Sequence, residues 1–293
     1  SGGNNRFQFY QTFELDTNMN LIVEFSFNDS IYGLQTIVKG EFVSDSIGLH
    51  SNDATHIEIN SAEHINIPSG PLSSISDEIT ISLWVYGDEN VLPVNTTLFE
   101  GLDTNGHRTV NVHFPWNNSR IYWDCGNTGT SYDRIDKAAN LTQYAGQWNH
   151  WTFTKNSNTG IMKIYLNGIL WHSGSGKTRL MNINSFKLGS KGNGMGYFWD
   201  GKIKEFRIFN KELSDSVIAD WANVRINNNH PNYINLVAYY PFNEGIGIIA
   251  NDNSPFGQIA NFNGNVQWKN SSGNNITSFF TSTSYRPNID FYS

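Results

Sequence analysis

Apolar and polar residues alternate along several short segments, and this alternation constrains the fold more than any other feature of the chain. The segment 79–85 (ITISLWV) has an aliphatic side chain at every second position. The segments 109–114 and 120–125 alternate in the same way, the first around Val110 and Val112 and the second around Trp123. A period of two residues is that of a β-strand with one buried face. The chain is therefore predicted to form antiparallel sheets.

Turn-forming residues separate these segments. Strands are expected at intervals of about 8–15 residues, with Gly, Asn and Ser between them. The clearest hairpin spans 162–174, where Asn167 and Gly168 fit a two-residue type I′ turn, and the preceding segment 146–156 is predicted to pair with it. This spacing favours two packed sheets over alternating strands and helices. One short helix is predicted over 215–224, with Ser214 as its N-cap.

The 293 residues are predicted to form one domain, 1–293, with 1–20 and 226–293 as added strands and extensions. The sequence LIVEFSFNDS (21–30) has a partial echo in LVAYYPFNEG (236–245). Too few residues follow the second copy to close another sandwich. We therefore expect this segment to return to the same domain as an added strand pair.

Charge and hydropathy exclude two classes of partner. The net charge is −7 and no run of Lys or Arg occurs, so no nucleic-acid partner is expected. No apolar stretch approaches the roughly 20 residues of a membrane span, so membrane insertion is not expected either. The single cysteine, Cys125, lies in an apolar strand position and is interpreted as a small buried hydrophobe.

The order of the segments resembles a known family. The series HIEINSAEHINI, ITISLWVYG, LFEGLDTNGHRTVNVHFPW, RIYWDCGN, GQWNHWTFTKN, MKIYLNGILWHSG and WDGKIKEFRIFNKELS is similar to the laminin-G-like, concanavalin A-like jelly rolls of bacterial, algal and large-virus surface proteins. The resemblance implies an all-β, two-sheet antiparallel jelly-roll sandwich. It also implies a secreted, cell-surface or virion protein that binds carbohydrate or protein on a concave face or rim loops, often with calcium.

A candidate ligand site follows from the alternation. If 110–114 and 120–125 pair, His113, Asn111, Tyr122 and Asp124 share the face opposite the core. Rings that stack on the C–H face of a sugar, beside polar groups that bind its hydroxyls, are typical of a carbohydrate site. An ordinary polar strand surface is the alternative, and for Trp199 burial in the core is another. The predicted ligand-binding residues are Arg108, Asn111, His113, Trp116, Tyr122, Asp124, Tyr132, Arg134 and Trp199.

A calcium ion would need six to eight oxygen ligands. The predicted donors are Asp29, Asp200, Glu205, Asp252 and Asn253. Relatives often carry an acidic pair where this chain has Lys204 and Glu205, which weakens the expectation. Asp252 in NDNSPFG is equally typical of a turn-capping side chain.

An enzyme is the least favoured class. Retaining glycoside hydrolases of this fold place their carboxylates along one strand, about 5–5.5 Å apart. Glu58 and Glu63 have a suggestive spacing, but Asn60 stands between them and the segment resembles a turn. We therefore predict a non-catalytic module for carbohydrate recognition or adhesion. The alternative is a structural or interaction module of a virion or surface layer that binds protein, as a multimer or part of a larger assembly.

Overall fold

The computed structural model describes residues 41–43, 46–48, 54–245, 247–271, 273 and 275. The chain divides into two units, Ser1–Asn52 and Asp53–Ser293. In the first, β1 (Glu41–Val43) pairs with β2 (Ser46–Gly48) as an antiparallel ladder. The predicted edge strand in 1–20, the segment 21–30 and Asp29 lie outside the described residues.

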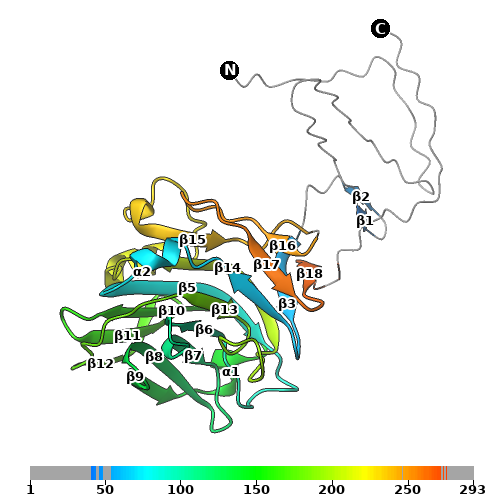
Figure 1. Cartoon of the computed structure of the whole chain (residues 1–293). Helices are drawn as coiled ribbons and strands as arrows, with labels where there is room; N and C mark the ends of the chain where they lie inside the picture. The colour runs from blue at the N-terminus through cyan, green and yellow to red at the C-terminus, as the bar shows by residue number, and fades with distance from the viewer. Residues whose placement is uncertain are drawn as a thin grey trace, which may run out of the picture. The chain divides into compact units, whose positions relative to one another are not determined.

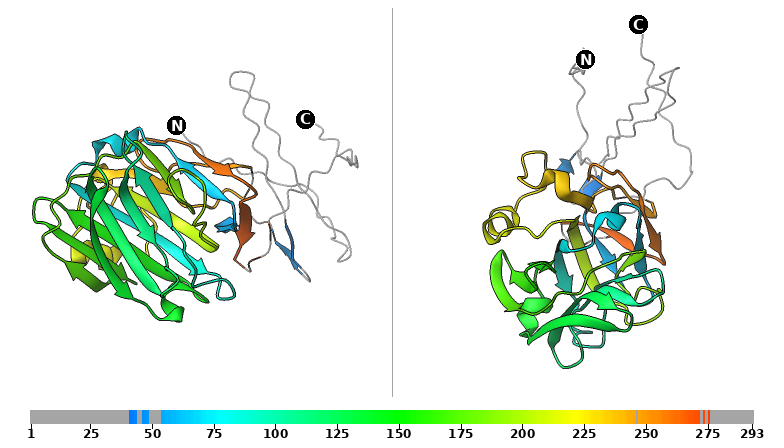
Figure 2. Two further views of the ribbon diagram at one scale, coloured as in Figure 1. Left: turned by 60° about the horizontal axis from the view of Figure 1, so that its bottom comes forward. Right: turned by 60° about the vertical axis from the view of Figure 1, so that its left-hand side comes forward.

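The second unit contains two antiparallel sheets (Figures 1 and 2). The sheet that we call the front sheet has the strand order β16-β17-β4-β13-β6-β7-β8-β9, and the back sheet has β12-β11-β10-β5-β14-β3-β18, with β15 also paired to β14. The front strands are β16 (Ile249–Ala250), β17 (Ala260–Asn263), β4 (His64–Ile67), β13 (Ser185–Leu188), β6 (Phe99–Leu102), β7 (Arg108–His113), β8 (Arg120–Thr128) and β9 (Ser131–Ala138). The back strands are β12 (Ile169–Gly174), β11 (Ile161–Leu166), β10 (Asn149–Asn156), β5 (Glu78–Gly87), β14 (Gly201–Phe209), β3 (Ala54–Ile59), β18 (Gln267–Asn270) and β15 (Leu236–Tyr240). The predicted all-β antiparallel sandwich is confirmed.

The alternating side chains fill the space between the two sheets. The ring of Phe99 on β6 lies 5.7 Å from the ring of Phe153 on β10 and 6.1 Å from that of Trp123 on β8. The indole N–H of Trp123 donates to the Thr154 carbonyl oxygen of the back sheet at 3.1 Å. Burying each large apolar side chain contributes about 1.5–3 kcal/mol. Cys125 is fully buried, and burial raises the pKa of its thiol to about 12.

The local predictions for the hairpin and the helix are confirmed in outline. Strands β11 and β12 meet at Asn167 and Gly168, whose φ angles are 51° and 80°. The helix α2 (Asp215–Trp221) begins after Ser214, whose hydroxyl accepts from the Val217 amide. It ends at Trp221, before the predicted residue 224, and the Arg207 guanidinium donates to the carbonyl oxygens of Trp221 and Val224.

The prediction of a single helix is incomplete. A second one, α1 (Leu141–Tyr144), follows a capping box between Asn140 and Gln143. Two 3₁₀ turns, η1 (Pro71–Ser74) and η2 (Tyr233–Asn235), are also present. At four residues, α1 is too short to show a helical period in the sequence. Among the described residues, no helix is both long and apolar enough to cross a membrane.

The C-terminal segment returns to both sheets. Strand β15 pairs with β14 and β18 with β3 in the back sheet, while β17 pairs with β4 in the front sheet. In the β3–β18 ladder, Ala54 is the cross-strand partner of Asn270. The segment 236–270 therefore covers the edges that β3 and β4 would otherwise leave open. The assignment of the whole of 1–293 to one domain stays a prediction.

Candidate functional site

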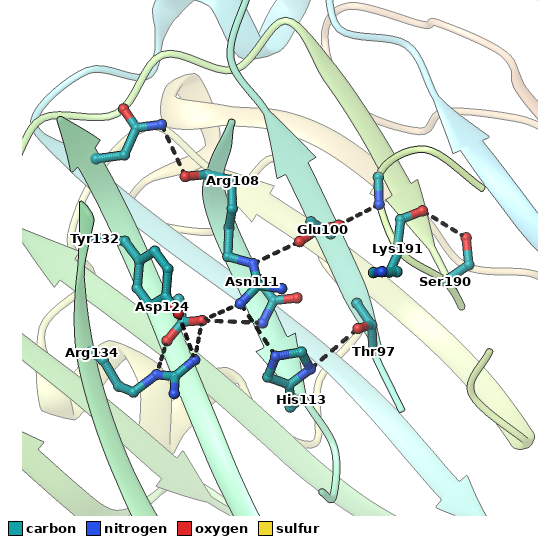
Figure 3. A network of polar contacts seen from close by, with 12 residues as sticks. Thr97, Glu100, Arg108, Asn111, His113, Asp124, Tyr132, Arg134, Ser190 and Lys191 are labelled. Atoms are coloured by element: carbon teal, nitrogen blue, oxygen red, sulfur yellow. Dashed lines mark hydrogen bonds and ion pairs between the residues drawn. The ribbon is translucent and has the colours of Figure 1, made fainter. Parts of the chain in front are cut away.

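A row of polar side chains crosses the outer face of the front sheet. Glu100 on β6, Asn111 on β7, Asp124 on β8 and Arg134 on β9 are successive cross-strand partners (Figure 3). The predicted pairing of 110–114 with 120–125 is confirmed, and it brings His113 opposite Tyr122. Because strand side chains alternate between faces, these residues lie opposite the apolar core.

Asp124 is the centre of this polar network. Its carboxylate is fully buried and accepts from Arg134 Nε at 2.5 Å and Nη2 at 2.8 Å. It also accepts from Arg108 Nη1 at 2.8 Å, while Asn111 Nδ2 lies 3.5 Å away. Two guanidinium groups thus compensate one buried charge with charge-assisted hydrogen bonds, which are among the strongest in proteins.

Arg108 joins Asp124 to a second carboxylate. Its Nε donates to Glu100 Oε1 at 2.6 Å, and Glu100 Oε2 accepts from the Gly192 amide at 2.5 Å. Burial opposes the charge of Arg108, but Glu100 and Asp124 outweigh burial and raise its pKa. The Arg108 side chain is 19% exposed, so this fixed cation reaches the surface.

His113 is neutral. Burial, followed by the positive charge of Arg108, lowers its pKa to about 4. Its Nδ1 lies 2.9 Å from the Thr96 carbonyl oxygen, which can only accept, and its Nε2 lies 3.3 Å from Arg108 Nη1, which can only donate. These partners assign the proton to Nδ1. His113 therefore orients Arg108 and does not supply a charge.

Aromatic rings border the network. Trp116 lies 4.4 Å from the His113 ring and 5.1 Å from that of Tyr197. The Arg134 guanidinium lies over Tyr122 at 4.7 Å and over Tyr132 at 5.1 Å. These cation–π contacts join the two tyrosine rings to the polar network.

A pocket of about 390 Å³ opens beside Arg108, and we call it the Arg108 pocket. Its lining residues are Glu100, Leu102, Gly106, His107, Arg108, Gly129, Thr130, Tyr132, Lys191 and Asn193. Of the predicted ligand residues, only Arg108 and Tyr132 line it. Glu100 and Lys191 were missed because β6, β13 and the glycine-rich turn 191–196 come together only through sheet pairing.

Several predicted ligand residues lie beneath the surface. Asn111 and Asp124 are fully buried and His113 is 4% exposed, because the two arginines cover them. They position the pocket wall and do not form an open groove. Trp199 is not at the surface either, since its side chain is fully buried beside Gly201, whereas Tyr197 is 37% exposed.

Two of the predicted calcium donors, Glu205 and Asp252, already bind other groups through their carboxylates. Glu205 pairs with Arg207 at 2.9 Å and accepts from the Tyr239 hydroxyl at 2.6 Å. Asp252 accepts from the Tyr239 and Ser254 amides, and the amide of the exposed Asn253 donates to the Tyr239 carbonyl oxygen. The turn-capping interpretation of Asp252 thus accounts for its carboxylate.

Asp200 is the remaining carboxylate among the described calcium candidates. Burial first, then Asp88, Glu58 and Glu63, raise the pKa of its carboxyl. In the described ranges, no group of three or more His, Cys, Asp or Glu side chains is arranged to hold a metal ion. Asp200, Glu205 and Asp252 therefore do not form such a group.

The carboxylates considered for glycoside hydrolysis lie on different elements. Glu58 is on β3 of the back sheet and pairs with Lys269 at 2.5 Å. Glu63 is in the turn that leads to β4 of the front sheet, where its amide donates to the Asn60 carbonyl oxygen. The two carboxylates therefore do not lie along one strand, the arrangement expected of a hydrolase of this fold.

Solved structures that are similar to the chain include the following three, and the first of them has the same fold. A candidate carbohydrate binding protein from Bacteroides ovatus matches with a TM-score of 0.54 at 18% identity, over 74% of this chain and 60% of that one. The receptor binding domain of a botulinum neurotoxin C/D mosaic matches with a TM-score of 0.47 at 20% identity, over 57% of this chain and 42% of that one. A heptameric pentraxin of Limulus polyphemus matches with a TM-score of 0.43 at 14% identity, over 61% of this chain and 89% of that one.

The chain thus spans less than two thirds of the Bacteroides protein. No curated protein matches the chain. The model of the concanavalin A-like lectin/glucanases superfamily matches residues 60–219, more than half of the sequence, and this range contains all the strands of the polar network. The chain belongs to the concanavalin A-like lectin/glucanases superfamily.

Proposed function

We propose that the protein is a non-catalytic carbohydrate-recognition module, secreted or surface-exposed, that binds a saccharide in the Arg108 pocket. The observation that carries the proposal is the fixed guanidinium of Arg108 at the pocket wall. Its Nε and Nη1 are held by Glu100 and Asp124, while Nη2 keeps two N–H donors without a partner among the described residues. A donor fixed in this way binds a hydroxyl with little loss of side-chain entropy.

The rest of the pocket fits the same ligand class. Tyr132 supplies an aromatic wall against which the C–H face of a sugar packs, and His107, Thr130 and Asn193 add polar groups. The pocket is open and small, so we expect single-site dissociation constants of about micromolar to millimolar. Adhesion would then depend on several copies acting together.

A glycan array with the intact chain, followed by calorimetry on the strongest glycan, tests the proposal. We expect Tyr132→Ala to weaken binding by about tenfold or more, because the ring wall is removed. Phe256→Ala, which removes a 47% exposed ring outside the pocket, is the matched control and should leave the affinity unchanged.

An array without a binder, or binding that Tyr132→Ala leaves intact, would contradict the proposal. Oligomers in solution combined with a silent array would support the protein-binding alternative. Repeating the array with EDTA tests the prediction of calcium, which is supported if binding is lost and restored by added calcium.

A further inference from the structure

The outer face of the back sheet carries a cluster of rings and lysines. Lys202 and Lys204 on β14 are cross-strand partners of Tyr86 and Trp84 on β5. Trp148, just before β10, joins them, with its ring 5.9 Å from that of Tyr86. We call these five half-buried residues the lysine–tryptophan patch. Helix α2 covers a different part of this face, where it packs around Phe209 and Tyr165.

The rings hold the two ammonium groups in place. Lys204 Nζ lies 4.5 Å from the ring centre of Trp148 and 5.4 Å from that of Trp84. Lys202 Nζ lies 4.8 Å above the ring of Tyr86. Cation–π contacts orient a cation but leave its net charge in place. The patch thus presents two positioned cations side by side.

No carboxylate of the described residues lies within 4.0 Å of either ammonium group. The neighbouring carboxylates have other partners: Glu58 pairs with Lys269, and Glu205 pairs with Arg207 and Arg225. Burial lowers the pKa of Lys204, and the opposing charge of Glu205, which is already paired with Arg207 and Arg225, does not offset the effect of burial.

A buried imidazole beside the patch points to the same excess of positive charge. His56 is 4% exposed and lies 5.2 Å from the ring of Trp148. Its Nε2 has no hydrogen-bond partner among the described residues. Burial first, then Lys202, Lys204 and Lys269, lower its pKa to about 4. A local excess of cations in a chain of net charge −7 favours an anionic ligand at this position.

We propose that the lysine–tryptophan patch is a second binding site, for an acidic saccharide whose carboxylate or sulfate groups contact Lys202 and Lys204. The half-buried rings of Trp148 and Tyr86 supply apolar walls for the sugar, as in other carbohydrate sites. The site lies on the opposite sheet from the Arg108 pocket. This proposal therefore does not depend on whether that pocket binds a sugar.

Calorimetry of the intact chain with three probes tests the site: a heparin-derived sulfated oligosaccharide, an oligogalacturonate and a neutral dextran oligosaccharide. We expect at least one acidic probe to bind, whereas binding of the neutral probe should not depend on Lys202 and Lys204. The K202Q/K204Q double variant should weaken acidic binding by about tenfold or more. Lys137→Gln is the matched control, because Lys137 also lies over a tryptophan, Trp171 at 4.7 Å, outside the patch.

Two further measurements distinguish a specific binding site from non-specific electrostatic attraction of polyanions. Trp148→Ala should weaken binding while Trp148→Phe retains most of it, and the NMR-measured pKa of His56 should rise when the acidic probe binds. Tyr132→Ala should leave acidic binding unchanged, which distinguishes this site from the Arg108 pocket. Failure of both acidic probes to bind, or equal losses in K202Q/K204Q and Lys137→Gln, overturns the proposal.

Discussion

At the residue scale, two aspartates of β8 and β9 show how burial changes the role of an ion pair. The Asp124 carboxylate is fully buried between Arg108 and Arg134. The carboxylate of Asp136 pairs with Arg120 at 2.6 Å, with the two side chains 29% and 38% exposed. Removing one partner of a buried pair leaves an uncompensated charge, whereas water compensates an exposed one.

Asp124→Ala is therefore expected to lower the free energy of unfolding by about 3–5 kcal/mol. Asp136→Ala, the matched control on the neighbouring strand, should lower it by less than about 1 kcal/mol. Urea titrations followed by tryptophan fluorescence measure both. Equal losses of unfolding free energy in the two variants would show that the buried ion pairs of Asp124 stabilise the fold no more than the exposed pair of Asp136.

The same residues mark the limit of what the sequence predicts about the site. Alternation correctly predicts that Asn111, His113 and Asp124 share the outer face, because the period of a strand is a local property. It does not predict that Arg108 and Arg134 cover them, because the reach of a long side chain depends on neighbouring strands. Trp199 could not be distinguished from Tyr197 for a similar reason: both follow the same glycine-rich turn.

At the element scale, the β11–β12 hairpin illustrates how a local signal combines with a distant contact. Gly168 has a φ of 80°, which the Asn-Gly pair predicts. A Cβ atom at this position would also lie 3.1 Å from Cα of Ala219 on α2, a contact that the sequence does not reveal. Gly168 is thus required both for the turn of the hairpin and for the close packing of α2 against that turn.

Gly168→Ala should therefore destabilise the protein by more than the roughly 1–2 kcal/mol of left-handed backbone strain. Gly176→Ala is the control, because Gly176 has a φ of 71° but nothing within 4 Å of the added methyl group. Comparing the urea midpoints of the two variants isolates the contact with α2. Identical midpoints would argue against that contact.

At the scale of the whole molecule, buried histidines link stability to pH, and four of them have a strongly lowered pKa. Burial is the largest cause of the lowered pKa in each, to about 4 in His56, His113 and His230 and to about 3 in His150. The folded chain keeps these rings neutral below pH 6.5, while the unfolded chain protonates them. The unfolded state then binds more protons, so the free energy of unfolding falls as pH falls.

The loss is expected to begin near the ordinary pKa of about 6.5 and to level off near the folded values. Each histidine contributes up to about 1.4 kcal/mol per pH unit within that window. Urea midpoints at about pH 7.5 and pH 5 measure the effect, and they should differ clearly. NMR titration of the four rings identifies the groups responsible, and a midpoint independent of pH would contradict the assignment.

The sequence predicts the sandwich but not the membership of its sheets. Alternation and Asn-Gly or Gly-rich turns identify most strands, because both signals act within a few residues. Whether β3 and β4 belong to one sheet depends on the turn at Asn60 and Glu63, which moves the chain from the back sheet to the front sheet. Strands of both sheets have the same alternation of apolar and polar residues. The sheet to which each strand belongs therefore follows only from the complete set of strand pairings.

The pairing of Ala54 with Asn270 has a mechanical consequence. Because β3 and β18 run antiparallel, the chain enters and leaves the sandwich at neighbouring points. Tension applied through the two flanking segments would open this ladder from one end, one hydrogen bond after another, and would not shear it along its length. In an optical trap, pulling on the two flanking segments should therefore break the β3–β18 ladder at a lower force than pulling the two strands past each other along the direction of β18. Equal rupture forces in the two geometries would contradict this prediction.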